Sequence, residues 1–351
     1  MNNLLKQLNH LDLDGILLIS DESRKYFADF VSSFGYLIFL KDKIYYITDS
    51  RYFEEAKKSV FKGIEVINTE SANLYPLLKE LLNGVKYLGA ELEILSHNFC
   101  LNLINQLNVN LIDISSEILK ITSVKNKTEI DCIIKGCEIC DGAFESILAK
   151  VIEGVTEREL AYELEYILRR SGADDRAFET IVAFSENAAV PHHKPCERKL
   201  RTGDIILFDF GAKVSGYHSD ISRTVAFGSV SGKFKETYKI LAGAQNLAIG
   251  GVKPGMKCFE LDKIVKDYLN KFSLDNYFTH GLGHGVGLKI HEHPSIKKEN
   301  EGVFENNMVF TIEPGIYLVD NFGIRIEDTV WLKDDKAVCL TKAEKKLIII
   351  N

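Results

Sequence analysis

The stretch GDIILFDFGAKVSGYHSDISRTVAF, residues 203–227, decides how the second half of the chain folds. Two runs rich in apolar and β-branched residues flank Ser215-Gly216, which is the pattern of a β-hairpin. A turn centred on Val214-Ser215 would place Asp209 directly opposite Asp220, where facing Cβ atoms lie about 4.5–5.5 Å apart. Two carboxylates at that distance repel each other, so either one takes up a proton or a cation lies between them.

A second predicted hairpin repeats this arrangement further along the chain. Strand Met308–Leu318 turns through residues near Asp320 into strand Ile324–Leu332, which places Glu313 opposite Glu327. The alternative is two unrelated pairs of surface acids on strands. That alternative is disfavoured because the first acid of each hairpin stands inside an apolar run, where an unpaired charge is costly. The two hairpins together predict a cluster of four carboxylates that binds cations.

A glycine-rich stretch, His280–Leu288, supplies a nitrogen donor, His284, between the two hairpins. Its four glycines allow a backbone or a metal to approach closely. A flexible loop with incidental histidines is disfavoured, because seven of the nine histidines lie between His192 and His293. The stretch lacks the Gly-Lys-Ser/Thr of a phosphate-binding loop and the downstream acid of a dinucleotide-binding motif, and the chain has no His-Glu-x-x-His helix.

The ligand set that results is rich in oxygen and runs in the order Asp209, Asp220, His284, Glu313 and Glu327. Such a set suits two divalent cations that share carboxylates. Two ions about 3.5–4 Å apart activate one water and polarise one carbonyl or phosphoryl oxygen. Oxygen-rich ligation favours harder ions such as manganese, with cobalt, zinc or iron as alternatives. The sequence therefore predicts a metal hydrolase.

These phrases resemble the M24 metallopeptidase family, whose members include Xaa-Pro aminopeptidase, Xaa-Pro dipeptidase (prolidase) and methionine aminopeptidase. The resemblance spans essentially the whole chain. It implies an α+β fold, in which a pita-bread catalytic domain, residues 123–351, follows a smaller creatinase-like α/β domain, residues 1–122. Helix and strand patterns alternate up to about residue 120, and apolar periodicity then predicts long helices. These are Glu129–Val151, Glu157–Arg170, Glu236–Ala248 and Cys258–Asn270.

The resemblance also implies roles for individual residues. The metal ligand Glu313 would double as the acid/base, and His192 and His291 would assist where oxyanion charge develops. Further residues would surround the substrate and the two glutamates: His280, Phe178, Ile290, Arg325 and Tyr317. The alternative for each is a buried or loop residue satisfied by hydrogen bonds or packing. His193 and His293 are interpreted as bystanders.

Within the family the sequence favours an Xaa-Pro aminopeptidase over a dipeptidase. A dipeptidase must bind the free carboxylate of its C-terminal proline, which calls for a cation. Prolidases often carry an arginine just after a His-Glu-x-Pro phrase, whereas this chain has Ser295 there, with Lys297 and Lys298 beyond it. The expected substrates are short peptides with proline at the second position, and Xaa-Pro dipeptides are the alternative. A metal-free binding module of the same fold is disfavoured because all the ligands are present.

The remaining composition narrows the expected partners and location. A net charge of −7 and a pI near 5.8 argue against nucleic-acid binding. No signal peptide is visible and no apolar run approaches the ~18 residues of a membrane span, so we expect a cytoplasmic enzyme. Seven cysteines fit reduced thiols, and Cys137-x-x-Cys140 lies in a predicted helix without a second pair, which disfavours a redox or metal motif. The resemblance implies a homodimer.

Overall fold

Nearly continuous apolar runs in the first third of the chain build a sheet that is buried on both faces. The structure is a computed structural model that describes residues 10–351, and the chain divides into two units, Met1–Thr122 and Ser123–Asn351. In the first unit Ile16 and Leu18 pack into one apolar cluster and Leu17 into another. Successive side chains of a strand point to opposite faces, so this sheet has a core on each side.

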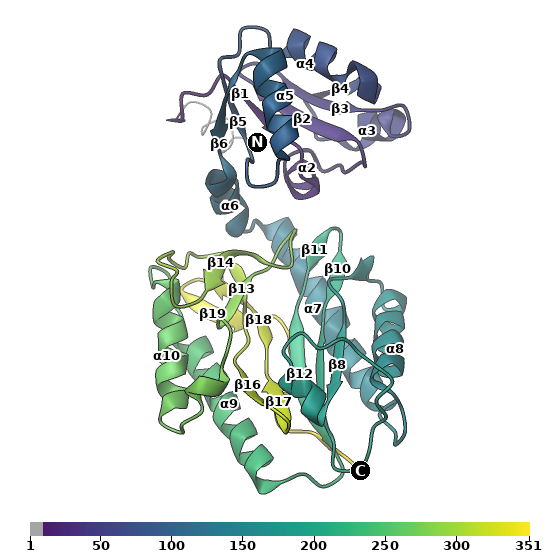
Figure 1. Cartoon of the computed structure of the whole chain (residues 1–351), viewed down its shortest axis with the longest axis vertical. Helices are drawn as coiled ribbons and strands as arrows, with labels where there is room; N and C mark the ends of the chain where they lie inside the picture. The colour runs from purple at the N-terminus through teal and green to yellow at the C-terminus, as the bar shows by residue number, and fades with distance from the viewer. Residues whose placement is uncertain (1–9) are drawn as a thin grey trace. The chain divides into compact units, whose positions relative to one another are not determined.

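The elements of the first unit are β1 (Gly15–Leu18), α2 (Asp21–Ala28), β2 (Gly35–Leu40), β3 (Ile44–Thr48), α3 (Phe53–Ser59), β4 (Ile64–Asn68), η1 (Ser71–Asn73), α4 (Leu74–Leu81), β5 (Tyr87–Ala90), α5 (His97–Leu107), β6 (Asn110–Asp113) and α6 (Ser115–Ser123). The strands form one sheet in the order β4-β3-β2-β1-β5-β6. Neighbours pair in parallel except β1 with β2 and β2 with β3. Residues of α2, α3 and α6 belong to one core and residues of α4 and α5 to the other (Figure 1).

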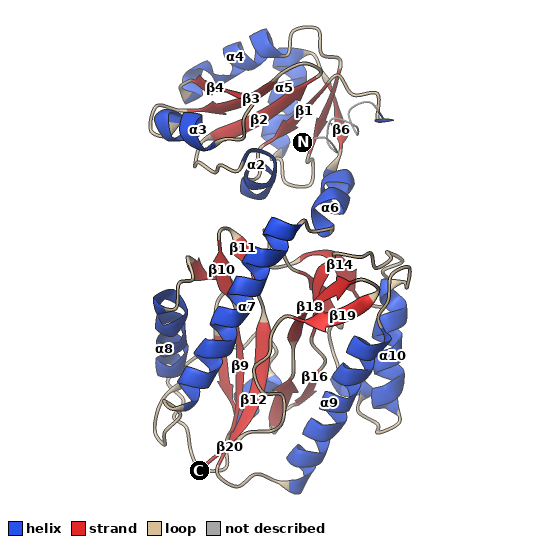
Figure 2. Ribbon diagram, turned by 180° about the vertical axis from the view of Figure 1, so that it is seen from behind, coloured by secondary structure: helices blue, strands red, loops and turns tan. Residues whose placement is uncertain are grey.

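The elements of the second unit are α7 (Lys127–Leu148), α8 (Glu157–Arg170), β7 (Asp175–Arg176), β8 (Ile181–Phe184), η2 (Ser185–Ala189), β9 (Ile205–Phe210), β10 (Ala212–Val214), β11 (Tyr217–His218), β12 (Ile221–Phe227), α9 (Gly232–Gly251), α10 (Cys258–Asn270), η3 (Asp275–Tyr277), β13 (Gly283–Gly285), β14 (Glu292–Ile296), β15 (Val309–Ile312), β16 (Gly315–Leu318), β17 (Phe322–Arg325), β18 (Asp328–Lys333), β19 (Lys336–Cys339) and β20 (Ile349–Ile350). The main sheets run β20-β12-β9-β8 and β14-β13-β15-β18-β19. Helices α7 and α8 pack with the first sheet, and α9 and α10 pack with the second (Figure 2). The strands therefore lie between two helix pairs.

Helices α7 and α8 begin where the sequence supplies a capping box. Asn126 accepts from the Glu129 amide at 3.2 Å while Glu129 accepts from the Asn126 amide at 2.8 Å. Thr156 and Glu159 do the same at the start of α8. Such caps satisfy amides that have no partner within the helix. The predicted bounds of α8 and α10 coincide with the structure, whereas α7 begins two residues before its prediction and α9 is longer at both ends.

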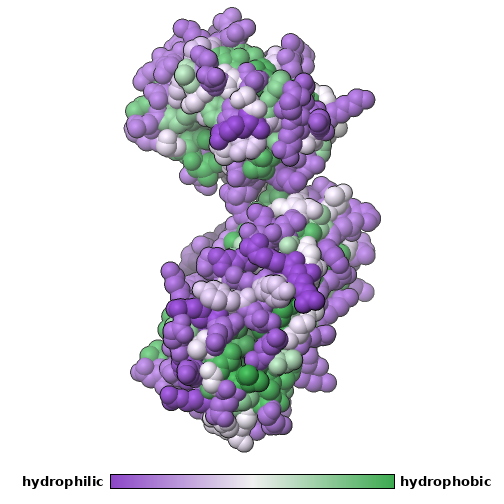
Figure 3. Space-filling model, turned by 90° about the vertical axis from the view of Figure 1, so that its right-hand side faces the viewer, coloured by the Kyte–Doolittle hydropathy of each residue, from purple (hydrophilic) through white to green (hydrophobic). Residues whose placement is uncertain are grey.

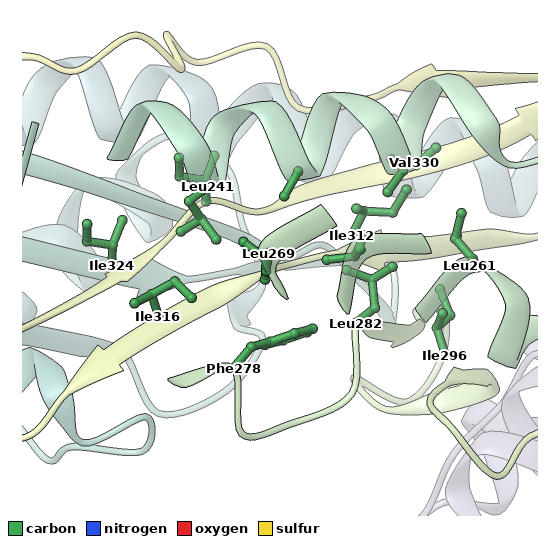
Figure 4. Close-up of a cluster of buried hydrophobic side chains, with 14 of the residues drawn as sticks. Leu241, Leu261, Leu269, Phe278, Leu282, Ile296, Ile312, Ile316, Ile324 and Val330 are labelled. Carbon is green, nitrogen blue, oxygen red and sulfur yellow. The ribbon is translucent and has the colours of Figure 1, made fainter. Parts of the chain in front are cut away.

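The core of the second helix pair fixes the strands that flank both predicted glutamate ligands. Figure 4 shows Leu241 of α9 and Leu261 and Leu269 of α10 with Ile312 of β15 and Val330 of β18, all fully buried. Burying one such side chain contributes about 1.5–3 kcal/mol. The strands that flank the two glutamates are therefore fixed by a fully buried apolar core.

One face of the molecule shows how its surface is composed. Hydrophilic side chains predominate there and hydrophobic ones gather in smaller patches (Figure 3). Within residues 10–351, no helix combines the length and the apolar composition that crossing a membrane requires.

Candidate metal centre

The first pair of predicted ligands lies on one hairpin, but the two residues do not face each other directly. Strands β9 and β12 pair Asp209 with Ser222, so Asp220 stands diagonally across from Asp209. The turn between β10 and β11 consists of Ser215-Gly216, with φ of 51° and 89°. The predicted turn at Val214-Ser215 is wrong by one residue, because a two-residue hairpin turn of this kind needs positive φ at both central positions, which glycine adopts without strain.

The second pair of predicted ligands does face each other. Ile312 pairs with Asp328 before the glutamates and Gly315 pairs with Arg325 after them. The same register in between places Glu313 opposite Glu327, as predicted. Both glutamates occupy breaks between strands. Glu327 also forms an isolated bridge with Ser222, its amide donating to the Ser222 carbonyl at 3.1 Å. The two hairpins therefore meet at their ligands.

Strand β13 holds His284 between two glycines that no larger residue could replace. A Cβ atom at Gly283 would lie 2.1 Å from the Thr311 carbonyl oxygen, and one at Gly285 would lie 2.2 Å from the His293 carbonyl oxygen. Glycine alone tolerates such an approach of neighbouring backbone. The glycine-rich motif thus serves close packing around the histidine.

The hydrogen bonding of His284 shows which of its nitrogens is free for a ligand. Its Nδ1 lies 3.1 Å from the Gly285 carbonyl oxygen, which can only accept, so Nδ1 carries the proton. Burial lowers the pKa of His284, which keeps the ring neutral. The lone pair on Nε2 then faces Glu313 Oε1 at 3.3 Å and Asp220 Oδ2 at 3.6 Å. A lone pair opposite two carboxylates is repulsive unless a cation or a carboxyl proton lies between them, and metal-binding histidines use this tautomer.

All five predicted ligands meet in one buried place. Donor atoms of Asp220, His284 and Glu327 lie within 4.8 Å of one another. Glu313 adjoins His284, and the charge of Asp209 acts on the three other carboxylates. Asp220 Oδ1 and Glu327 Oε1 are buried without a hydrogen-bond partner. Buried polar atoms are normally paired, so these two oxygens are suited to a cation.

The pKa shifts of the carboxylates agree with a cation site at this centre. Burial, reinforced by the neighbouring carboxylates, raises the pKa of Asp220 and of Glu327 well above the usual range. Burial likewise raises the pKa of Glu313, with Asp209 adding to the effect. Four crowded carboxylates and one neutral imidazole are the donors that hard divalent cations prefer. The residues present therefore fit divalent cations.

A buried hydrogen-bond chain supports the centre from one side. The Arg325 guanidinium contacts Asp209 and donates to the Tyr317 hydroxyl at 2.8 Å. His280 Nδ1 lies 2.7 Å from the Gly281 carbonyl oxygen and must donate to it, so His280 Nε2 accepts from Tyr317 at 2.9 Å. Burial raises the pKa of Tyr317 to about 12, so its proton stays in place. Both ring nitrogens of His280 are engaged, and a substrate contact through the ring would have to replace the Tyr317 bond.

The other predicted residues lie around the same centre. The His291 ring packs edge-on against His284, with centroids 4.3 Å apart. Burial, together with the charges of His284 and His192, lowers the pKa of His291 to about 4. His192 is exposed on the loop after η2. Phe178 lies against Gly211, 3.0 Å from the place of a Cβ atom there, and Ile290 packs partly buried beside α7.

Sequence reasoning missed two hydroxyls that hold ligand carboxylates. Ser222 donates to Glu327 Oε2 at 2.6 Å. Thr311 donates to Glu313 Oε1 at 3.1 Å and accepts from the His284 amide at 3.1 Å. A signal for Thr311 was present, because residues two apart on a strand share a face. For Ser222 the signal was the hairpin register, which was predicted one residue off.

An ion pair between Lys125 and Glu292 also escaped prediction. The two side chains are 1% and 6% exposed. Lys125 additionally donates its amide to the Asn307 carbonyl at 2.9 Å, and Glu292 directly follows His291. A buried charge needs such a partner. The pair therefore ties the segment before α7 to the loop that carries His291.

The Cys137-x-x-Cys140 motif lies inside α7, and both side chains are fully buried. Burial raises the pKa of Cys140 to about 12 and that of Cys137 well above its usual range. The Cys140 sulfur is 3.3 Å from the Ser219 hydroxyl oxygen. Thiolate is the reactive and metal-binding form of cysteine, and burial disfavours it here.

Two family models match the chain. The model of metallopeptidase family M24 matches residues 131–334, and the creatinase/prolidase N-terminal domain matches residues 1–124. An Xaa-Pro dipeptidase of Pyrococcus furiosus is 34% identical over 350 residues, covering 99% of each chain. Among solved structures, an Xaa-Pro dipeptidase from Bacillus anthracis has a TM-score of 0.95 at 36% identity, covering 99% and 98% of the two chains. An X-Pro aminopeptidase from Thermotoga maritima has a TM-score of 0.91 at 33% identity, covering 98% and 100%. These likenesses confirm the predicted fold class.

Proposed function

The chain belongs to metallopeptidase family M24, and from that premise we propose that it is an Xaa-Pro dipeptidase with a two-cation centre. The observation that carries the metal centre is the His284 lone pair that faces two buried carboxylates. Sequence reasoning favoured the aminopeptidase. The relatives of P. furiosus and B. anthracis, which match nearly the whole chain, support the dipeptidase instead.

In this proposal the cations are held by Asp209, Asp220, His284, Glu313 and Glu327. When bound, they supply Lewis acidity that lowers the pKa of water and polarises the scissile carbonyl, and the oxygen-rich set favours manganese. Glu313 takes a proton from the attacking water and passes it to the leaving prolyl nitrogen. The expected homodimer stays a prediction.

Further residues would act on the substrate side or hold those that do. With its pKa lowered to about 4, His291 is neutral at physiological pH and can donate an N–H to developing oxyanion charge. Arg325 and Tyr317 hold Asp209 and His280 in place. We assign His192 to the same side of the centre, because its charge acts on His280 and His291. Phe178 and Ile290 would supply apolar surface for the proline ring.

Paired substrates test this function directly. We expect purified protein reloaded with Mn²⁺ to release the first residue of an Xaa-Pro dipeptide, and chelation to abolish the reaction, because the substrate contacts depend on the cations. Mass spectrometry of an Xaa-Pro dipeptide and an Xaa-Pro-Yaa-Zaa peptide gives the readout. Release from the longer peptide alone would contradict the dipeptidase and establish an aminopeptidase.

The aminopeptidase remains a second candidate because Ser295 stands where prolidases often carry an arginine. This residue pairs with His284 across β13 and β14, so both side chains lie on the same face. Lys297 follows two positions later, and its Cβ lies 3.1 Å from where a side chain at Gly281 would begin. Lys297 is exposed and begins beside Gly281, the residue after His280, so we propose it as the cation that binds the carboxylate of a dipeptide.

Replacing Lys297 with methionine distinguishes the two candidates. We expect KM for the dipeptide to rise about tenfold, ~1.4 kcal/mol, because a charge-assisted hydrogen bond to the carboxylate is lost. KM for the longer peptide should stay unchanged. Lys298→Met is the matched control, since it removes the neighbouring exposed lysine of the same segment after β14. Equal effects of both substitutions on both peptides would remove Lys297 from carboxylate recognition.

A further inference from the structure

A second cluster of potential ligands joins the start of α8 to the loop between η2 and β9, and none of its residues belongs to the centre described above. Its anchor is Glu157, the first residue of α8, whose side chain is fully buried. Glu157 Oε1 accepts from the Phe184 amide at 2.8 Å and from Asn187 Nδ2 at 2.9 Å. Glu157 Oε2 is 2.7 Å from His193 Nε2 and accepts from the Cys196 amide and Cys196 Sγ, both at 3.1 Å.

The three side chains of this cluster offer one oxygen, one nitrogen and one sulfur. The ligand atoms of Glu157, His193 and Cys196 lie within 4.8 Å of one another. Thiolate and imidazole donors select zinc-like ions, whereas carboxylate-rich sites suit harder ones. We propose that Glu157, His193 and Cys196 form a separate binding site for a thiophilic divalent cation of the zinc class. In this proposal His193 is a ligand and not a bystander.

The donors that surround Glu157 bring no permanent positive charge to this buried carboxylate. A carboxylate has about four lone-pair sites for its two oxygens, yet five donors converge on Glu157, three of them on Oε2. Within residues 10–351, the only ion-pair partner of this buried charge is His193, which is charged only when protonated. Buried carboxylates normally have a permanent cation nearby. One divalent cation would replace the thiol and imidazole hydrogens on Oε2.

The charge and proton balance of this binding is simple. Burial and the adjoining Glu157 raise the pKa of Cys196, so the thiol is protonated when no cation is bound. On binding, the thiol proton leaves to solvent, and the His193 proton moves from Nε2 to Nδ1. The carboxylate and the thiolate then neutralise the cation. Binding should therefore strengthen as the pH rises.

The two metal sites differ in donor type, so different ions can fill them. The catalytic centre has four carboxylates and one imidazole, which suits Mn²⁺. The cluster around Glu157 has the only thiol among these donors. A protein preloaded with Mn²⁺ should therefore still bind Cd²⁺ or Co²⁺ through Cys196. Thiolate coordination to these ions gives charge-transfer absorption that carboxylate coordination does not.

Titration of the Mn²⁺-loaded full-length protein with Cd²⁺, followed by ultraviolet absorption, tests the site. Two variants keep the hydrogen bonds to Glu157 while weakening ligation: Cys196→Ser and His193→Gln. We expect Cys196→Ser to abolish the thiolate absorption and His193→Gln to weaken Cd²⁺ binding at least about tenfold, since loss of even a supporting residue of a metal ligand has that effect. Circular dichroism verifies that both variants fold.

Cys100→Ser is the control, because Cys100 is a partly exposed thiol on α5 in the other unit. The Cd²⁺ titration of this variant should match that of the unaltered protein. Absence of thiolate absorption in the unaltered protein would overturn the proposal, as would absorption that persists in Cys196→Ser. The readout is independent of peptidase activity, so failure of the proposed function would leave this result standing.

Discussion

Replacing Glu327 with glutamine is expected to lower kcat/KM for Xaa-Pro hydrolysis on the order of 10³-fold, ~4 kcal/mol, because a neutral amide binds a divalent cation more weakly than a carboxylate does. Glutamine keeps the size of the side chain and can still accept from Ser222. The charge alone is removed. Activity at saturating Mn²⁺, compared with the unaltered protein, measures the loss.

Thermal unfolding separates loss of metal from loss of fold. Mn²⁺ should raise the Tm of the unaltered protein, since a ligand at 100 times its Kd stabilises by about 2.7 kcal/mol per site. In Glu327→Gln this shift should largely vanish. With chelator present the variant should be at least as stable as the unaltered protein, because one of four repelling buried carboxylates is gone. Glu305→Ala, an exposed glutamate of the same unit, is the control. A full Mn²⁺ shift in Glu327→Gln would remove this residue from the ligand set.

Replacing Arg223 with methionine is expected to lower the free energy of unfolding by about 3 kcal/mol. Arg223 and its ion-pair partner Asp328 are 1% and 0% exposed. The guanidinium also donates to the carbonyl oxygens of Ser222, Glu327 and Ala343. The loss should fall at the low end of the range for buried pairs, because Lys345 still adjoins Asp328 at 2.8 Å.

Urea unfolding followed by Trp331 fluorescence measures this loss in the catalytic unit, because the chain has a single tryptophan. Burial would raise the pKa of Asp328, but the charges of Arg223 and Lys345 outweigh it and the pKa is lowered. The carboxylate therefore contributes stability above about pH 4 that is lost as the pH falls through its folded pKa. In Arg223→Met acid unfolding should begin at a higher pH. Arg201→Met, at an exposed position, is the control and should change the free energy of unfolding by less than ~0.5 kcal/mol. Equal losses in Arg223→Met and Arg201→Met would contradict a stabilising role of the Arg223–Asp328 ion pair.

Local signals in the sequence predicted much of the fold and the two hairpins that carry the candidate carboxylate ligands. The bounds of α8 and α10 follow from caps and apolar periodicity, both of which are local. The facing of Glu313 and Glu327 follows from the turn near Asp320. The predicted turn of the first hairpin lies one residue too early. Gly216 was the local signal for its true position, because such turns require positive φ at both central residues. The helix α2, Asp21–Ala28, was missed.

Contacts between distant positions were beyond sequence reasoning. Arg325 and Asp209 are separated by 116 residues, and Lys125 and Glu292 by 167. Spacing along the chain says nothing of such pairs until the sheets are assembled. The choice between dipeptidase and aminopeptidase suffered in the same way. It rested on Ser295 in place of an arginine, and the sequence did not show that Lys297 begins beside Gly281.

The buried pair of Lys125 and Glu292 determines where this protein can be shortened. Helix α7 begins at Lys127, which makes it a natural place to start a fragment of the catalytic unit. Such a fragment would lack Lys125 and would leave Glu292 as a buried anion next to His291. It would also lose the bridge between Val124 and Met308. A working fragment should therefore begin at or before Ser123, because the residues before the first long helix are part of the packed second unit and not a spacer.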